Sequence, residues 1–330
     1  MGVWLKWLAS VGVAVVAGGV LVYLINCGPA LNGGERARSG PPGAAGPPAP
    51  ERPAGGADTL RIGWTAWSDA EVMTLMAQRL LERHTDLEVE RVMTDIGVQY
   101  QGVANGDLDI MLMGWLPVTH RNYWDQVRDE VVNLGVLYTG RLGWVAPSYV
   151  PEEQVSSLTD LADPEVAKRM GGKVQGIDPG SGLMQASEEA MEAYNLQELE
   201  LVASSSAAMT AVLDRAIRNG EWVVVTAWQP HWIFASYDLR FLDDPKRVLG
   251  REERVHALAR EGFQADFPPA VTGFFSRLHV PREELAAILL EVQQTSVGEA
   301  VDRYIETHPR RVRYWLTGAV EESDESPQPQ

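Results

Sequence analysis

The stretch Leu108-Asp109-Ile110-Met111-Leu112-Met113 runs through Gly114 into Trp115-Leu116-Pro117-Val118-Thr119-His120. Its first six residues are almost all large and apolar, which is typical of a strand buried in the core of an α/β protein. The proline favours a turn directly after the strand. This turn brings an indole and an imidazole to the same place, so the stretch predicts a buried strand that ends at a ligand pocket.

Two further tryptophans stand in comparable positions. Trp67 follows the strand-like run Leu60–Trp64, and Trp228 follows the run Trp222–Ala227. Three indole rings at three strand ends suggest an aromatic cage. Indole faces attract quaternary ammonium groups, which have no N–H to donate to a hydrogen-bond acceptor. We therefore expect a small ligand with an alkylated cation at one end and an acid, held by the imidazole, at the other.

Short apolar runs alternate with helical patterns on both sides of this stretch. The expected strands are 60–64, 87–92, 108–113, 173–177 and 222–227, and the expected helices are 72–80, 98–105, a helix from 121, 183–194 and 208–217. Strands separated by helices imply parallel sheets with crossover connections. The pattern therefore predicts an α/β fold.

Composition limits the class of protein. The chain has 330 residues, of which 45% are hydrophobic, so it is long enough for two globular domains. Lys and Arg number 28 against 45 Asp and Glu, and a net charge of −17 argues against a nucleic-acid partner. The single cysteine, Cys27, excludes an intramolecular disulfide and a thiolate metal site. No cofactor loop is recognisable, so we expect neither a cofactor nor a metal.

The first 27 residues are expected to form an export or membrane segment. No charge interrupts the run from Trp7 to Ile25, which at about 1.5 Å per residue is long enough to cross a bilayer core of roughly 30 Å. Leu24-Ile25-Asn26-Cys27 resembles a lipobox, although Asn26 departs from the small residue expected there. Either a lipidated Cys27 or an uncleaved anchor would tether the protein outside the cytoplasm. Residues 28–58 are expected to be a disordered linker and 319–330 a flexible acidic tail.

The loop Asp178-Pro179-Gly180-Ser181-Gly182-Leu183 joins an expected strand to an expected helix. The free N–H groups at a helix start attract anions. Since the loop has no lysine and no Walker spacing, a carboxylate suits it better than a phosphate.

Several motifs together resemble those of the substrate-binding proteins of glycine betaine and proline betaine ABC transporters. The motifs are Gly63–Trp67, Met111–Pro117, Gly143–Pro147, Gly176–Gly180 and Ala227–Trp232. The resemblance implies the two-lobed periplasmic-binding-protein fold, type II-like, with a hinge that lets the lobes close over a ligand. By motif position, lobe I comprises 59–142 and 242–318, and lobe II comprises 143–241.

The resemblance also implies which residues bind the ligand. Trp67, Trp115 and Trp228 match the cage that encloses a trimethylammonium group, and His120 with the backbone N–H groups of Gly182 and Leu183 matches the carboxylate site. Asp69 and Glu71, just after Trp67, could cap the following helix or contact the cation of a ligand, and capping is the favoured interpretation. The role of His231 stays open, because it neighbours Trp228 but also precedes a possible helix.

We therefore expect a monomeric, extracytoplasmic binding protein without enzymatic activity that delivers betaine-type solutes to an ABC permease. One alternative is a ligand-sensing domain for choline- or carnitine-type amines that signals to a membrane partner. A second alternative, an enzyme acting on a small amine or acid, has little support, because no arrangement of nucleophile, base or cofactor loop stands out in the sequence.

Overall fold

The computed structural model describes residues 57–320. The predicted export segment with Cys27, nearly all of the predicted linker and most of the predicted tail lie outside these residues. Within 57–320, none of the helices is both long and apolar enough to span a membrane.

One mixed sheet organises the fold, in the strand order β2-β1-β3-β9-β4-β7-β5-β6, and β8 pairs with β4 outside this path. The strands are β1 (Thr59–Trp64), β2 (Glu88–Met93), β3 (Ile110–Leu116), β4 (Val131–Pro147), β5 (Lys173–Gln175), β6 (Glu200–Val202), β7 (Val224–Gln229), β8 (Leu239–Phe241) and β9 (Glu252–Arg260). All five strands expected from the sequence are present, and the predicted α/β class is confirmed.

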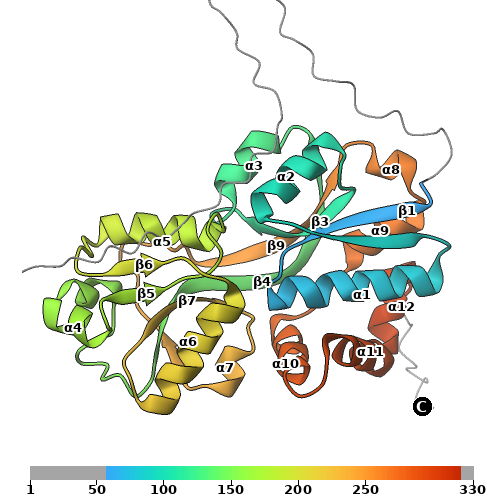
Figure 1. Ribbon diagram of the computed structural model, residues 1–330. Coiled ribbons are helices and arrows are strands. Elements are labelled where there is room, and N and C mark those ends of the chain that lie inside the picture. The colour runs from blue at the N-terminus through green and yellow to red at the C-terminus, as the bar shows by residue number, and fades with distance from the viewer. Residues whose placement is uncertain (1–56, 321–330) are drawn as a thin grey trace, which may run out of the picture. The chain divides into compact units, whose positions relative to one another are not determined.

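The outer parts of the sheet are parallel and its centre is antiparallel. β1 is parallel to β2 and β3, and β5 is parallel to β6 and β7. β9 is antiparallel to β3 and β4, and β4 is antiparallel to β7. The expectation of parallel sheets is therefore wrong at the centre. The reason is topological: β4 leads from the first half of the sheet into the second, and β9 runs back in the opposite direction (Figure 1).

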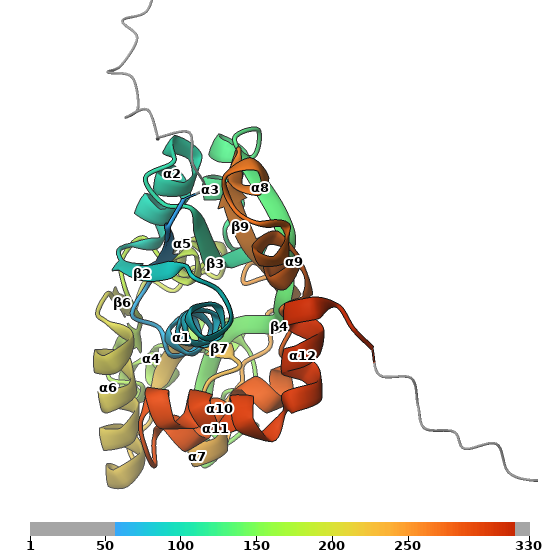
Figure 2. The same cartoon turned by 90° about the vertical axis from the view of Figure 1, so that its right-hand side faces the viewer.

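Twelve α-helices and one short 3-10 helix (Leu158–Ala162) accompany the sheet in the described part of the chain. The α-helices are α1 (Ser68–His84), α2 (Ile96–Asn105), α3 (Arg121–Val127), α4 (Pro164–Arg169), α5 (Gly182–Ala193), α6 (Ser206–Asn219), α7 (Ile233–Ser236), α8 (Phe263–Asp266), α9 (Pro269–Arg277), α10 (Arg282–Val292), α11 (Val297–Thr307) and α12 (Pro309–Thr317). Helix α1 contacts β1, β2 and β3 on one side and α10 and α11 on the other, as Figure 2 shows.

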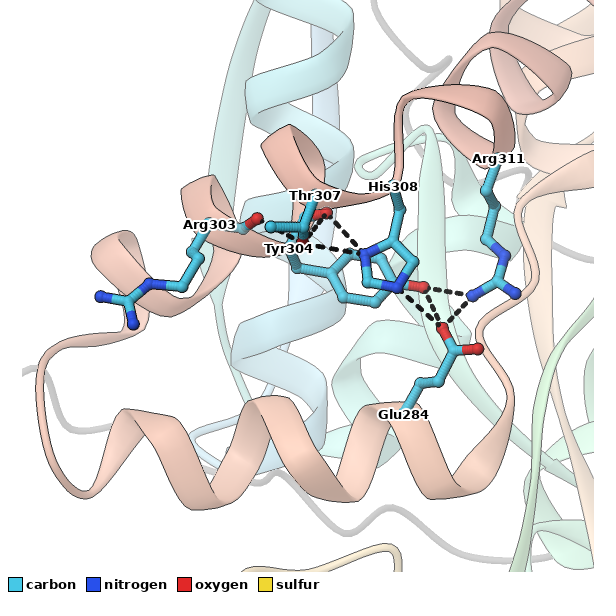
Figure 3. Close-up of polar contacts among 6 residues, drawn as sticks. All are labelled: Glu284, Arg303, Tyr304, Thr307, His308 and Arg311. Carbon is cyan, nitrogen blue, oxygen red and sulfur yellow. Dashed lines mark hydrogen bonds and ion pairs between the residues drawn. The ribbon is translucent and has the colours of Figure 1, made fainter.

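A polar cluster fastens the three C-terminal helices to one another (Figure 3). The hydroxyl of Tyr304 on α11 donates to the Oε2 of Glu284 on α10 at 2.7 Å. Arg311 on α12 donates to the Tyr304 hydroxyl at 2.6 Å and forms an ion pair with Glu284. The ring of His308 stacks on Tyr304 with centroids 4.1 Å apart. These partners satisfy one another, so the cluster stabilises the helix packing rather than forming a binding site.

The buried apolar side chains form two clusters. The larger one extends from Leu60 and Met111 in the first half of the sheet to Leu213 and Trp228 in the second. The smaller one surrounds Trp144 and belongs to the half that contains β5 and β6. The described residues, 57–320, lie in one compact unit by their contacts, which is consistent with a core that continues through the junction of the two halves.

Candidate functional site

One cavity lies where β3, β7 and the first turns of α1 and α5 meet. It contains about 290 Å³ of space, part of which is open to solvent. All six residues selected from the sequence line it: Trp67, Trp115, His120, Gly182, Leu183 and Trp228. Every one of them is buried, so the structure brings the two predicted halves of the site together.

Trp67 and Trp228 form one aromatic wall. Their ring centroids are 6.4 Å apart and the ring planes are inclined at 56°. The Nε1–H of Trp67 donates to Asp178 Oδ2 at 3.0 Å, which fixes the indole against the loop before α5. The ring of His231 meets Trp228 edge to face at 4.6 Å. His231 does not line the cavity, so its contact with Trp228 gives it a supporting place behind the wall.

Trp115 forms a second wall at the end of β3. Its ring packs edge to face against Tyr138, with centroids 6.2 Å apart. On β4, Gly140 passes so close to the indole that a Cβ there would lie 2.2 Å from the ring. Only a glycine leaves room for Trp115 at this point, so the backbone of β4 itself helps to fix the ring.

Asp69 also lines the cavity, beside the tryptophans. Its side chain does not cap α1: the N-cap residue is Trp67 and no side chain there makes a capping bond. Asp69 Oδ2 accepts a hydrogen bond from the Tyr138 hydroxyl at 2.7 Å, whereas Oδ1 has no partner among residues 57–320. Burial raises the pKa of this carboxyl to about 6, although the Tyr138 hydrogen bond and the nearby N–H groups of Asp69, Ala70 and Trp228 oppose the shift. Asp69 is therefore not the N-cap residue, and of the two interpretations left open by the sequence its place in the cavity favours contact with a ligand's cation. The cavity thus has an anionic group at its aromatic end.

His120 is a neutral donor. Its Nδ1 accepts the backbone N–H of Trp115 at 3.2 Å, so a neutral ring in this position carries its proton on Nε2. Burial lowers the pKa of His120 to about 3. The structure therefore favours an uncharged imidazole, in which a hydrogen bond with the backbone of Met113 only partly opposes the effect of burial.

The start of α5 supplies two backbone donors. Ser181 caps the helix by accepting the N–H of Met184 at 3.2 Å, and the N–H groups of Gly182 and Leu183 precede the first intrahelical bond. Gly182 also touches the turn after β3, because a Cβ on it would lie 2.4 Å from the carbonyl oxygen of Thr119. The two sides of the cavity meet at this glycine.

Polar contacts around the rim connect the same two sides. The Tyr123 hydroxyl on α3 donates to the carbonyl of Gly180. Gln185 on α5 donates to the Tyr123 hydroxyl at 2.7 Å and accepts from Asn122 at 3.1 Å. Sequence reasoning missed these residues, because polar side chains at the surface of helices, exposed or half-buried, show no periodic pattern that reveals a distant partner. They hold the walls of the cavity together at its edge.

The cavity is chemically two-ended. Indole faces and a carboxylate form one end, and two helix-start amides with a neutral imidazole form the other. The first end suits a cation without N–H groups, and the second suits a carboxylate. In residues 57–320, no group of three or more His, Cys, Asp or Glu side chains is placed to hold a metal ion.

Comparisons with known proteins agree with this chemistry. Residues 58–307 match the family described as the substrate-binding domain of the ABC-type glycine betaine transport system. The glycine betaine/carnitine transport binding protein GbuC of Listeria monocytogenes is 36% identical over 173 residues. That match covers 50% of this chain and 57% of the Listeria protein, so the chain spans little more than half the length of this relative.

Two solved structures have the same fold over most of their length. The glycine betaine/L-proline-binding protein ProX of Borrelia burgdorferi is 29% identical, with a TM-score of 0.73 over 78% of this chain and 96% of that one. Lactococcal OpuAC, in a closed form complexed with glycine betaine, is 32% identical, with a TM-score of 0.71 over 78% of this chain and 99% of that one. With the family model matching most of its residues, this chain belongs to the substrate-binding domains of ABC-type glycine betaine transport systems.

Proposed function

We propose that the chain captures a betaine outside the cytoplasm and delivers it to an ABC permease, with glycine betaine and proline betaine as its ligands. The observation that carries the proposal is a cavity, lined by buried residues, with an aromatic, anionic end and an N–H donor end. A betaine has a matching pair of ends, a trimethylated or dialkylated ammonium and a carboxylate.

The ammonium group would lie among Trp67, Trp115 and Trp228. Each indole face contributes on the order of 0.5 to 2 kcal/mol when the contact is desolvated. Asp69 adds a charge of opposite sign, because its pKa of about 6 leaves it mostly ionised at neutral pH. The tilt of 56° between Trp67 and Trp228 gives the ammonium two differently oriented faces instead of one flat surface.

The carboxylate would accept hydrogen bonds from the N–H groups of Gly182 and Leu183 and from Nε2 of His120. Such charge-assisted bonds at a helix start are strong and need little reorganisation. Choline has no carboxylate and would leave these buried donors without partners, which is unfavourable. We therefore expect betaines to bind more tightly than choline.

Binding would close two lobes over the ligand. The sequence places lobe I at 59–142 and 242–318 and lobe II at 143–241, and we propose to keep these lobes but to move their second boundary. Leu242 and Leu249 pack in the smaller cluster around Trp144, which supports a second hinge crossing near residue 251, just before β9. The bonds of Trp67 to Asp178 and of Tyr123 to Gly180 would form only in the closed state that the permease recognises.

The remaining features of the proposal come from the family and the amino terminus. We propose a monomer without cofactor or turnover of its ligand, tethered to the membrane through lipidated Cys27 or a retained anchor. The relatives and structures reported above are transport proteins, and nothing in their descriptions favours the alternative of a sensor domain.

Calorimetry on the full chain in detergent tests the proposal with glycine betaine, proline betaine, choline and carnitine. We expect both betaines to bind more tightly than choline. Trp115→Ala should lower the affinity for glycine betaine by about 2- to 30-fold, which corresponds to the loss of one indole contact. Trp222→Ala is the matched control, because Trp222 packs under Arg169 away from the cavity and its loss should leave the affinity unchanged. Absence of binding heat with all four compounds would refute the proposed function.

A further inference from the structure

Glu253 is a buried carboxylate whose burial needs an explanation. It is the second residue of β9 and is only 2% exposed, while its neighbours Glu252 and Arg254 are exposed. Buried acidic side chains are rare unless they are paired. In the described part of the chain no Lys, Arg or His forms an ion pair with Glu253, so its partners must be of another kind.

The partners of Glu253 lie in the turn between β3 and α3. Its Oε2 accepts the backbone N–H groups of Val118 at 2.8 Å and Thr119 at 2.9 Å. Its Oε1 accepts the hydroxyl of Thr119 at 2.5 Å. Pro117 has no N–H, and the N–H of His120 donates to the carbonyl of Trp115 at 2.9 Å. One side chain thus occupies both backbone donors that the turn itself leaves unpaired.

This turn forms part of the donor end of the cavity. Thr119 lines the cavity, and its carbonyl oxygen lies where the backbone of Gly182 approaches most closely. His120 follows directly and holds its proton on Nε2 only while Nδ1 stays within reach of the Trp115 N–H. Any rotation of the Val118–Thr119 peptide planes would move both residues relative to α5.

We infer that Glu253 is a positioning residue that fixes the turn 117–120, and through it the ring of His120, at the carboxylate end of the ligand cavity. The consequence for betaine affinity rests on the proposed function, whereas the consequence for His120 does not. Because Glu253 lies on β9, the strand that returns from the second half of the sheet, it also links the cavity wall to the junction of the two halves.

The test compares substitutions at position 253 in the full chain. Glu253→Ala removes all three acceptor contacts. Glu253→Asp keeps the charge but withdraws the carboxylate by one methylene, and it carries the same test if the alanine variant does not fold. Glu253→Gln keeps the shape: its carbonyl accepts both N–H groups and its amide donates to the Thr119 hydroxyl. Glu252→Ala is the matched control, because it removes the same charge from the exposed neighbouring residue.

The first readout needs no ligand. Ring ¹⁵N NMR of the histidines, with His120 assigned from the spectrum of His120→Gln, reports which nitrogen carries the proton. We expect a single Nε2–H form in the parent, Glu253→Gln and Glu252→Ala, and an exchanging mixture in Glu253→Ala and Glu253→Asp. A loss of stability alone would leave the ring tautomer of the folded fraction unchanged.

The second readout is the ratio of glycine betaine affinity to choline affinity by calorimetry. Glu253→Ala should reduce betaine affinity by about tenfold and choline affinity much less, because choline has no group for the donor end. Glu253→Gln should stay within about threefold of the parent. An unchanged His120 spectrum in both Glu253→Ala and Glu253→Asp would overturn the inference. If the parent binds no betaine while the His120 spectrum responds as expected, the positioning role stands and the proposed function fails.

Discussion

Replacing Gly140 with alanine tests whether the backbone of β4 fixes the cage. The added methyl carbon would lie 2.2 Å from Cη2 and 2.4 Å from Cζ3 of Trp115. Ordinary contacts begin near 3.4 Å, so the ring must retreat by more than 1 Å (3.4 − 2.2 = 1.2 Å). The carbonyl oxygen of Gln229, 2.8 Å from the same carbon, opposes a compensating shift of the backbone. Trp115 therefore has to move relative to the other two indoles.

The expected size of the effect follows from packing and from ligand contact. Overfilling a well-packed site costs about 1 to 3 kcal/mol of folding stability. Displacing one of the three indole faces reduces the free energy of ligand binding by about 0.5 to 2 kcal/mol, which corresponds to about 2- to 30-fold in affinity. Gly140→Ala should therefore lower both the free energy of unfolding and the affinity for glycine betaine.

Urea denaturation and calorimetry on Gly140→Ala, Trp115→Phe and the double variant separate the two effects. Phenylalanine lacks Cη2 and Cζ3, so alanine at position 140 should destabilise the Trp115→Phe background less than the parent. Some loss should persist because the contact with Gln229 remains. If Gly140→Ala binds glycine betaine as tightly as the parent, or if its cost in stability is the same in both backgrounds, the close approach of β4 does not position the indole.

Two further predictions concern ionisation. The pKa of Asp69 is about 6 in the folded protein against an ordinary value of 3.8, so ionised Asp69 opposes folding at pH 7 by up to about 3 kcal/mol. Asp69→Asn should therefore raise the urea midpoint at pH 7 while weakening the binding of glycine betaine, and a lower midpoint would contradict this. His120 and His231 have folded pKa values of about 3 against 6.5, so the unfolded chain binds the extra protons and stability falls as the pH drops from 6.5 towards 3. At pH 5 the loss is about 2 kcal/mol per histidine, partly offset below pH 6 by protonation of Asp69 in the folded state. A His120→Gln, His231→Gln variant should show a flatter decline between pH 7 and pH 5 by urea denaturation, and an equally steep decline would exclude these histidines as its source.

Local patterns predicted β1, β2, β3, β5 and β7, because each is a short apolar run bounded by helices. The three-residue strands β6 and β8 are too short to leave such a pattern. β4 and β9 were not predicted, and the reason is visible in their residues. Polar residues and glycines such as Asn133, Gly135 and Arg141 interrupt the apolar pattern of β4, and its pairing with β9 is irregular near Asn133–Gly135 and Val136–Tyr138. These strands depend on partners more than a hundred residues away, as in the pairing of Val132 with Ala259. Such pairing is tertiary information that a local pattern does not contain.

The residues of the site also divide into those that the sequence reveals and those that only the structure reveals. The three tryptophans, His120 and Gly182 occur in motifs that can be recognised in the sequence. The sequence favours a helix cap for Asp69, and only the structure reveals its hydrogen bond with Tyr138 and its place in the cavity. Gly140 and Glu253 have no local pattern, since one acts by leaving space for a ring and the other by accepting bonds from a distant turn.

Gly140 and Glu253 are register partners on adjacent strands β4 and β9. The glycine abuts the ring of Trp115, and the carboxylate holds the turn that begins just after that ring. A single cross-strand pair thus supports both the aromatic wall and the donor turn that His120 completes. Because β4 pairs with β9 through residues 131–141 and with β7 through 141–145, this pair lies next to the place where the sheet passes from one half to the other. In the proposed closing movement, bending at that junction would shift the ammonium contacts and the carboxylate contacts together. The strands that form the hinge would then also determine in which conformation the cavity has all of its ligand contacts in place.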